Sequence, residues 1–167
     1  MKHLKIIATL LLVTICYSCK VQYGFTQPTS IDAKTFQVNY FQNNAPLVEP
    51  GLDRDFRTAL QDLILNQTNL DLVTSGADLT YEGEIVEYRI SPTTATAQNT
   101  AAQNRLTISV QVRFFDKNNP DNDIDQRFSF FYDYPGSSQI DAVKAEAFEE
   151  IFERINQDII NATLAKW

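Results

Sequence analysis

The chain has 167 residues, with 14 Lys and Arg against 21 Asp and Glu, and a formal net charge of −7 at pH 7. Such an acidic protein is not expected to bind nucleic acid, because that affinity comes mainly from neutralising phosphates with Lys and Arg. The only histidine is His3, and the only cysteines are Cys16 and Cys19. Without these side chains the rest of the chain has no means for Ser-His-Asp or Cys-His catalysis or for a histidine zinc site. We therefore expect no enzyme activity, no metal and no cofactor.

The first 18 residues predict a lipoprotein signal peptide. A basic start precedes the apolar residues 6–15, which are too few for a spanning helix of about 20 residues. Ser18 is the small residue needed directly before a lipidated cysteine, so we expect the mature protein to begin at Cys19 and to carry acyl chains there. An ordinary cleaved secretory signal shares most of these features and remains an alternative, as does a disulfide between Cys16 and Cys19.

Removal of the signal peptide, residues 1–18, leaves the length of one domain with a net charge of about −9. Residues 19–33 are polar and predict a lipidated tether, and residues 34–167 predict a single domain. Because the mature chain is acidic, it is not expected to adsorb to anionic lipid by charge. We expect the acyl chains to supply the membrane attachment.

The first half of the domain predicts a strand, a helix and a short extended piece at residues 70–73. After residue 34, apolar and polar residues alternate with the period of a half-buried strand, and the apolar ones are Phe36, Val38 and Tyr40. A turn at residues 50–51 precedes a helix over residues 52–66. The apolar stripe of this helix is Phe56, Ala59, Leu60, Leu63 and Ile64.

Residues 78–90 predict a long strand whose apolar residues change face. The two sets are Leu79, Tyr81 and Ile85 on one face, and Val86, Tyr88 and Ile90 on the other. Gly83 lies near the change, so we expect a β-bulge or a sharp twist there. Residues 91–104 are uncharged and nearly free of bulky apolar side chains, and they predict a long loop.

Two more strands and a second helix complete the pattern. Residues 105–116 alternate strictly, residues 117–123 form a turn, and residues 124–133 repeat the alternation. Ser137 or Ser138 is expected to cap a helix that reaches about Leu164. The order β-α-β-β-β-α predicts an α+β fold, a two-layer sandwich in which two amphipathic helices pack on a mainly antiparallel four-stranded sheet.

Three arginines, Arg105, Arg113 and Arg127, are expected on the sheet face that points away from the helices. If the hairpin pairs residues whose numbers sum to 240, Arg113 faces Arg127, which is unfavourable unless an anion or a carboxylate lies nearby. A slip of two residues instead pairs Arg113 with Asp125. The arginines are therefore candidates for binding phosphate, and ordinary ion pairing across strands remains the alternative.

Two aromatic residues, Phe115 and Phe131, are expected on the same outer face, where exposed aromatic rings indicate a partner surface. The alternating carboxylates of residues 121–125 could suggest calcium. However, Gln126 and Tyr132 stand where an EF-hand loop requires Gly and Glu. We interpret this segment as a solvated turn, and Glu82, Glu84 and Glu87 as surface charges.

Five segments of the chain resemble the LptE family of lipopolysaccharide-assembly lipoproteins: residues 23–26, 43–62, 77–92, 99–116 and 149–167. Together they span almost the whole mature chain. The resemblance implies two helices on a four-stranded sheet. It also implies a non-catalytic outer-membrane lipoprotein that faces the periplasm, plugs the LptD β-barrel and helps to assemble it. This pair would deliver lipopolysaccharide to the outer leaflet.

The resemblance further implies that basic side chains contact lipopolysaccharide, for which Arg105, Arg113 and Arg127 are the candidates. A free-standing periplasmic lipoprotein that binds a lipid or a glycan is the alternative function. In both cases the lipid on Cys19 attaches the protein to the membrane.

Overall fold

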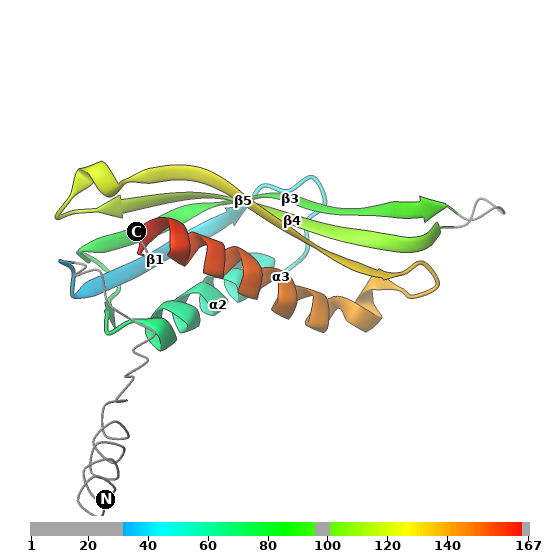
Figure 1. Ribbon diagram of the computed structural model, residues 1–167, viewed down its shortest axis with the longest axis horizontal. Coiled ribbons are helices and arrows are strands. Elements are labelled where there is room, and N and C mark those ends of the chain that lie inside the picture. The colour runs from blue at the N-terminus through cyan, green and yellow to red at the C-terminus, as the bar shows by residue number, and fades with distance from the viewer. Residues whose placement is uncertain (1–31, 96–100, 165–167) are drawn as a thin grey trace, which may run out of the picture.

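A computed structural model describes residues 32–95 and 101–164. The predicted signal peptide, Cys19 and nearly all of the tether lie outside the described residues. Figure 1 shows the arrangement of the helices and strands. In chain order they are β1 (Thr35–Asn43), α2 (Leu52–Gln67), β2 (Asp71–Leu72), β3 (Leu79–Ala95), β4 (Ala101–Asp116), a 3₁₀ turn (Pro120–Asn122), β5 (Ile124–Pro135) and α3 (Ile140–Thr163).

The strands form one mixed sheet in the order β2-β1-β3-β4-β5. β1 runs parallel to β2 and β3, whereas β4 runs antiparallel to both of its neighbours, β3 and β5. Both helices cover the same face of the sheet (Figure 1). The predicted two-layer α+β fold is confirmed. The predicted count of four strands is wrong by one, because the short extended piece near residue 71 pairs with β1 as β2.

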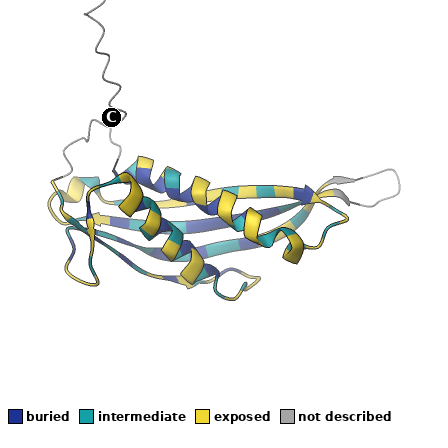
Figure 2. Cartoon of the chain, turned by 90° about the horizontal axis from the view of Figure 1, so that it is seen from below, coloured by how far each residue is buried: buried dark blue, intermediate teal, exposed yellow. Residues whose placement is uncertain are grey.

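Aromatic side chains link the two layers through the core. Phe41 of β1 meets Phe56 of α2 with ring centroids 5.2 Å apart, and Phe56 meets Phe152 of α3 at 5.5 Å. Phe148 continues the row to Tyr88 of β3. Such edge-to-face pairs add to the free energy gained by burying the rings. Figure 2 shows buried residues recurring along both helices and along the strands that they cover.

The alternation predicted for the first strand is wrong at Tyr40. The register between β1 and β3 shifts between Val38 and Phe41, so that two residues of β1 lie opposite Glu82. As a result Phe41 is fully buried, whereas 62% of Tyr40 is exposed. One extra residue in a strand reverses the faces of all that follow.

The irregularity predicted at Gly83 lies three residues further along β3. Gly83 pairs with Val112 in unbroken register, and the register shifts between Ile85 and Glu87. This bulge returns Tyr88 to the core side, where it is buried. Gly83 is needed for a different reason: a Cβ there would lie 2.0 Å from the backbone oxygen of Gln111.

The long loop predicted for residues 91–104 is mostly paired strand. β3 continues to Ala95 and β4 begins at Ala101, with Ser91 opposite Arg105 and Pro92 opposite Asn104. Composition alone did not reveal this, since the segment lacks the bulky side chains that mark a strand. In Figure 1 the two paired ends extend past the first turn of α3.

The start of α2 agrees with the prediction, and the start of α3 differs from it. Gly51 precedes α2 with a φ of 83°, a conformation that favours glycine and confirms the predicted turn. At α3 the residue before the helix is Gln139, and it makes no side-chain capping hydrogen bond. The predicted cap at Ser137 or Ser138 is therefore wrong.

Candidate functional site

The face of the sheet opposite the helices is polar and charged; we call it the polar face. Side chains alternate between the two faces along β3, β4 and β5, so the polar residues of each strand lie together on the face away from the helices. Its members with hydrogen bonds or ion pairs include Glu82, Glu87, Arg89 and Ser91 of β3, Arg105, Ser109, Gln111 and Arg113 of β4, and Asp125, Arg127, Ser129 and Asp133 of β5. All three arginines predicted from the sequence lie here.

Arg105 is held between a carboxylate and an aromatic ring. Its Nε and Nη2 donate to the two carboxylate oxygens of Asp133 at 2.7 and 2.8 Å, the two-pronged geometry that suits a guanidinium. The hydrogen bonds from Arg105 hold the pKa of Asp133 below its usual value. The guanidinium carbon also lies 3.6 Å from the ring centre of Phe131, a cation–π contact.

Arg113 of β4 forms its ion pair with β3 rather than with β5. The hairpin register places Arg113 opposite Asp125, so the register with a two-residue slip is correct and the like-charge pairing is not. The ion pair that forms, however, joins Arg113 Nε to Glu82 Oε1 of β3 at 3.1 Å. Asp125 instead accepts a hydrogen bond from Gln111 at 2.6 Å.

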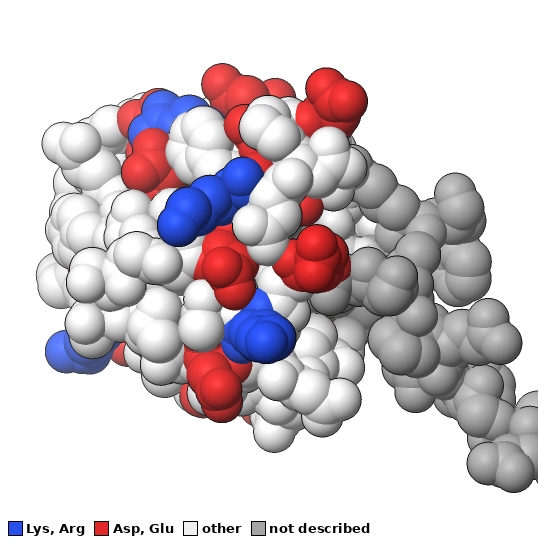
Figure 3. Space-filling model, turned by 90° about the vertical axis from the view of Figure 1, so that its left-hand side faces the viewer, with Lys and Arg blue, Asp and Glu red and all other residues white. Residues whose placement is uncertain are grey.

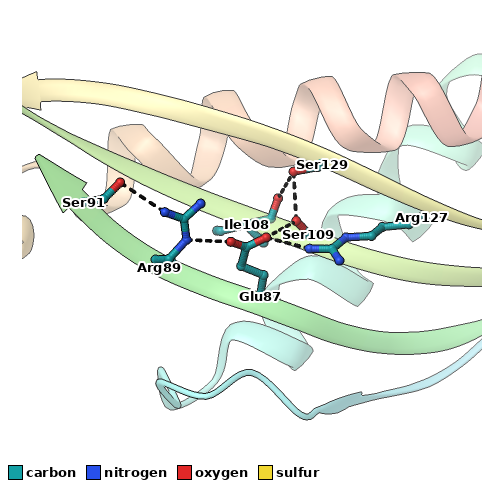
Figure 4. Close-up of polar contacts among 7 residues, drawn as sticks. All are labelled: Glu87, Arg89, Ser91, Ile108, Ser109, Arg127 and Ser129. Carbon is teal, nitrogen blue, oxygen red and sulfur yellow. Dashed lines mark hydrogen bonds and ion pairs between the residues drawn. The ribbon is translucent and has the colours of Figure 1, made fainter. Parts of the chain in front are cut away.

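Glu87 is the centre of the largest polar network on this face (Figure 4). Its carboxylate accepts from Arg89 Nε at 2.7 Å and from Arg127 Nη2 at 2.6 Å. Ser109 Oγ donates to the same carboxylate at 2.9 Å and lies 2.8 Å from Ser129 Oγ. The hydrogen bond from Arg89 is the main cause of a lowered pKa for Glu87, against the opposing effect of burial.

The network at Glu87 changes the interpretation of two residues. The sequence predicts Glu87 as a simple surface charge, yet its carboxylate forms ion pairs with two arginines. Arg89 was not singled out, although its spacing of two from Glu87 places both on one face of a strand. That spacing was the signal in the sequence.

Side chains of opposite charge lie next to one another at one end of the molecule (Figure 3). Figure 3 shows the end of the molecule where β4 turns into β5, with Lys and Arg side chains lying beside Asp and Glu. At this turn Asp116 accepts from the backbone N–H groups of Asn118 and Asn119. Asp123 accepts from the backbone of Asp116. The described residues contain no group of three His, Cys, Asp or Glu side chains arranged to hold a metal ion.

The two predicted outward aromatics are where the alternation placed them. Phe115 is 40% and Phe131 39% exposed.

A groove of about 470 Å³ lies further along β3. Sequence reasoning missed it, because the groove depends on where β1 ends. We call it the β3 groove; its lining includes Leu47, Val86, Ile90, Arg89 and Arg127. Within the described ranges, no helix is both long and apolar enough to cross a membrane.

The two-layer fold and its charge-paired sheet face define the class of protein: a small α+β domain that presents a broad polar surface. The comparison with protein families shows which family within this class the chain belongs to. The model of the LptE family, described as lipopolysaccharide-assembly, matches residues 33–163. The chain therefore belongs to the LptE family. No curated protein matches the sequence.

Solved structures share the fold at low sequence identity. Protein CT253 of Chlamydia trachomatis is 11% identical with a TM-score of 0.57, and the match covers 80% of this chain and 99% of that one. Protein XCC0632 of Xanthomonas campestris is 13% identical with a TM-score of 0.54, covering 79% and 84%. A minor lipoprotein of Acinetobacter baumannii is 14% identical with a TM-score of 0.51, covering 80% and 94%.

Proposed function

We propose that this chain is a non-catalytic, periplasm-facing lipoprotein of the outer membrane that plugs an LptD-type β-barrel and helps to assemble it. Through this barrel, lipopolysaccharide would reach the outer leaflet. The match to the LptE family over residues 33–163 carries the proposal. The membrane attachment would be the lipid on Cys19, since stable anchoring requires at least two acyl chains or a second signal.

The polar face supports the role of a plug. Barrel lumens are polar, and a charge is costly to bury unless it is paired. Arg105, Arg113 and Arg127 each have a carboxylate partner already. The face can therefore be covered by a barrel wall without leaving these cations unpaired.

The β3–β4 hairpin supports the same role. Residues 91–104 carry no charged side chain, so the hairpin can enter a narrow lumen without charges that would have to lose water. Its paired strands also satisfy their own backbone hydrogen bonds along the shared edge. We propose that this hairpin and the polar face are the parts of the chain inside the barrel.

Direct contact with lipopolysaccharide is proposed for Arg105, Arg113 and Arg127. A phosphate would have to displace or share the carboxylates that these arginines hold. Replacing all three by alanine should then weaken binding of lipopolysaccharide at least about tenfold, because each charge-assisted hydrogen bond contributes roughly 1.5–3 kcal/mol. Arg54→Ala on α2 is the control. Unchanged affinity in the triple variant would exclude these residues.

Co-purification tests the proposed partner. The full-length chain with a C-terminal tag is extracted from outer membranes in mild detergent, and the attached proteins are identified and counted. We expect one large β-barrel for each copy of the chain. Recovery of the chain without a barrel would refute the plug and favour the free-standing lipoprotein that binds a lipid or a glycan.

A further inference from the structure

Among the strands that the structure describes, none lies beside one edge of β3 over about half its length. β1 accompanies β3 only as far as the pair Asn43 and Ile85, where the backbone N–H of Asn44 donates to the carbonyl of Ile85. From Glu87 to Ala95, β3 pairs with β4 alone among the described strands. An edge of this kind presents backbone donors and acceptors on which another strand can form.

The position of Pro92 shows which residues face the open edge. Proline lacks an N–H, so inside a strand it stands where that group would point away from the paired neighbour. The register from Glu87 to Pro92 is continuous. Backbone direction alternates with a period of two, so Ile90 and Tyr88 direct their N–H and C=O groups to the open edge. Pro92 ends this run of donors.

The β3 groove runs beside this open edge, with an apolar wall and a surplus of positive charge. Leu47 and Ile90 line it and are 52% and 36% exposed. Arg89 and Arg127 also line it, and both draw on the single carboxylate of Glu87. In a chain with a net charge of −7, this is a local site that favours an anion.

We infer that the β3 groove docks an extended segment of a partner protein, which adds to the sheet beside Tyr88 and Ile90. Backbone hydrogen bonds would supply the affinity, and side-chain contacts would supply the specificity. Apolar side chains of the segment would cover Leu47 and Ile90, and a carboxylate would meet Arg89 and Arg127. The inference does not require the partner to be a barrel, because the groove recognises an extended segment with these side chains, whatever protein carries it.

The outer edge of β5 is the competing site in this sheet. It is also without a neighbouring strand in the described part of the chain. However, charged side chains of both signs, Asp125, Arg127 and Asp133, follow one another along it. Charges on an edge discourage pairing, and β5 carries these three against two, Glu87 and Arg89, on the open stretch of β3. The apolar groove lies at β3, which is why we assign docking to that edge.

Amide hydrogen exchange on the isotope-labelled, full-length chain in detergent micelles tests the inference. The probe is an end-capped peptide of about seven residues in which valine and glutamate alternate, a pattern suited to strand addition. At saturating peptide, exchange of the Tyr88 and Ile90 amides should slow at least about tenfold, because both become hydrogen-bonded. The same peptide methylated on alternate backbone nitrogens should bind at least about fivefold more weakly, since it lacks the donors.

Two variants separate the groove from general surface effects. Ile90→Pro removes one open-edge donor at a position equivalent to Pro92, and Leu47→Asp introduces repulsion at the groove wall. Each should weaken peptide binding about tenfold. Val48→Asp is the matched control, because Val48 is the next residue and 63% exposed, yet it does not line the groove. Leu47→Asp does not alter β3, so it still tests the groove if Ile90→Pro fails to fold.

Three results would overturn the inference. The first is unchanged exchange at Tyr88 and Ile90 with saturating peptide. The second is protection of β5 amides instead. In the third, phosphatidylglycerol micelles shift the signals of Arg89 and Arg127 while the peptide does not, so that the occupant is a lipid headgroup rather than a strand.

Discussion

Gly83 shows how one residue determines the spacing of the sheet. It lies where β3 meets β4, and Phe41 of β1 packs against the same point: a Cβ on Gly83 would lie 2.9 Å from its ring. The backbone oxygen of Gln111 is closer still and belongs to a paired strand, so it cannot move aside alone. The absence of a side chain, rather than unusual backbone torsion, is what this position requires.

Replacing Gly83 by alanine should therefore destabilise the fold. We expect a loss of about 1–3 kcal/mol in the free energy of unfolding, the usual cost of forcing extra volume into a packed site. Urea denaturation followed by circular dichroism measures it. Glu84→Ala, one residue along the same strand, is the control; it loses one exposed hydrogen bond, from Asn44, and should cost less than about 1 kcal/mol. Equal stability of Gly83→Ala and the wild type would show that β3 and β4 can move apart at this position without cost.

At the scale of elements, the sequence predicts which helices and strands exist better than it predicts the register in which the strands pair. Strict alternation located β4 and β5, and helical spacing located α2. Two features could not be found this way: the exact position of the bulge that the change of face predicts, and the strand pairing of residues 91–95. Both depend on hydrogen bonds to a distant strand, and alternation within one segment carries no information about that partner.

The same limit applies to the candidate site. The outward direction of Arg105, Arg113 and Arg127 followed from alternation. Their partners did not, because Arg113 selects Glu82 from the strand on the opposite side of β4. Strand order and register therefore decide which charges meet.

The network at Glu87 predicts acid sensitivity. Its pKa is lowered in the folded state, so the unfolded chain binds a proton more readily, and folding stability falls as pH drops below the ordinary value of 4.5. Glu87→Gln should flatten the decline in stability between pH 7 and pH 3, by about 1 kcal/mol. Thermal denaturation across this range measures it. Glu149→Gln, on an exposed position of α3, should leave the decline unchanged; an equally steep decline in the Glu87 variant would contradict the argument.

At the scale of the whole molecule, the predicted anchor and the fold lie in different parts of the sequence. The first strand begins at Thr35, well after the predicted lipid on Cys19. Cys19→Ala should therefore remove membrane attachment while leaving the unfolding free energy within about 0.5 kcal/mol. Fractionation and denaturation of the same variant check both parts. A variant that stays in the membrane would show that Cys19 is not the anchor, and one that unfolds would show that the two are coupled.

The central claim is that the sheet side of this chain lies inside a barrel. Site-specific photo-crosslinking in the outer membrane tests it most directly, with the crosslinker placed at Thr93 on the hairpin, at Phe115 on the polar face, or at Thr58 on the exposed side of α2. We expect Thr93 and Phe115 to crosslink to one large β-barrel, and Thr58 to do so weakly or not at all. Crosslinks to the barrel from Thr58 alone, or from none of the three, would contradict it.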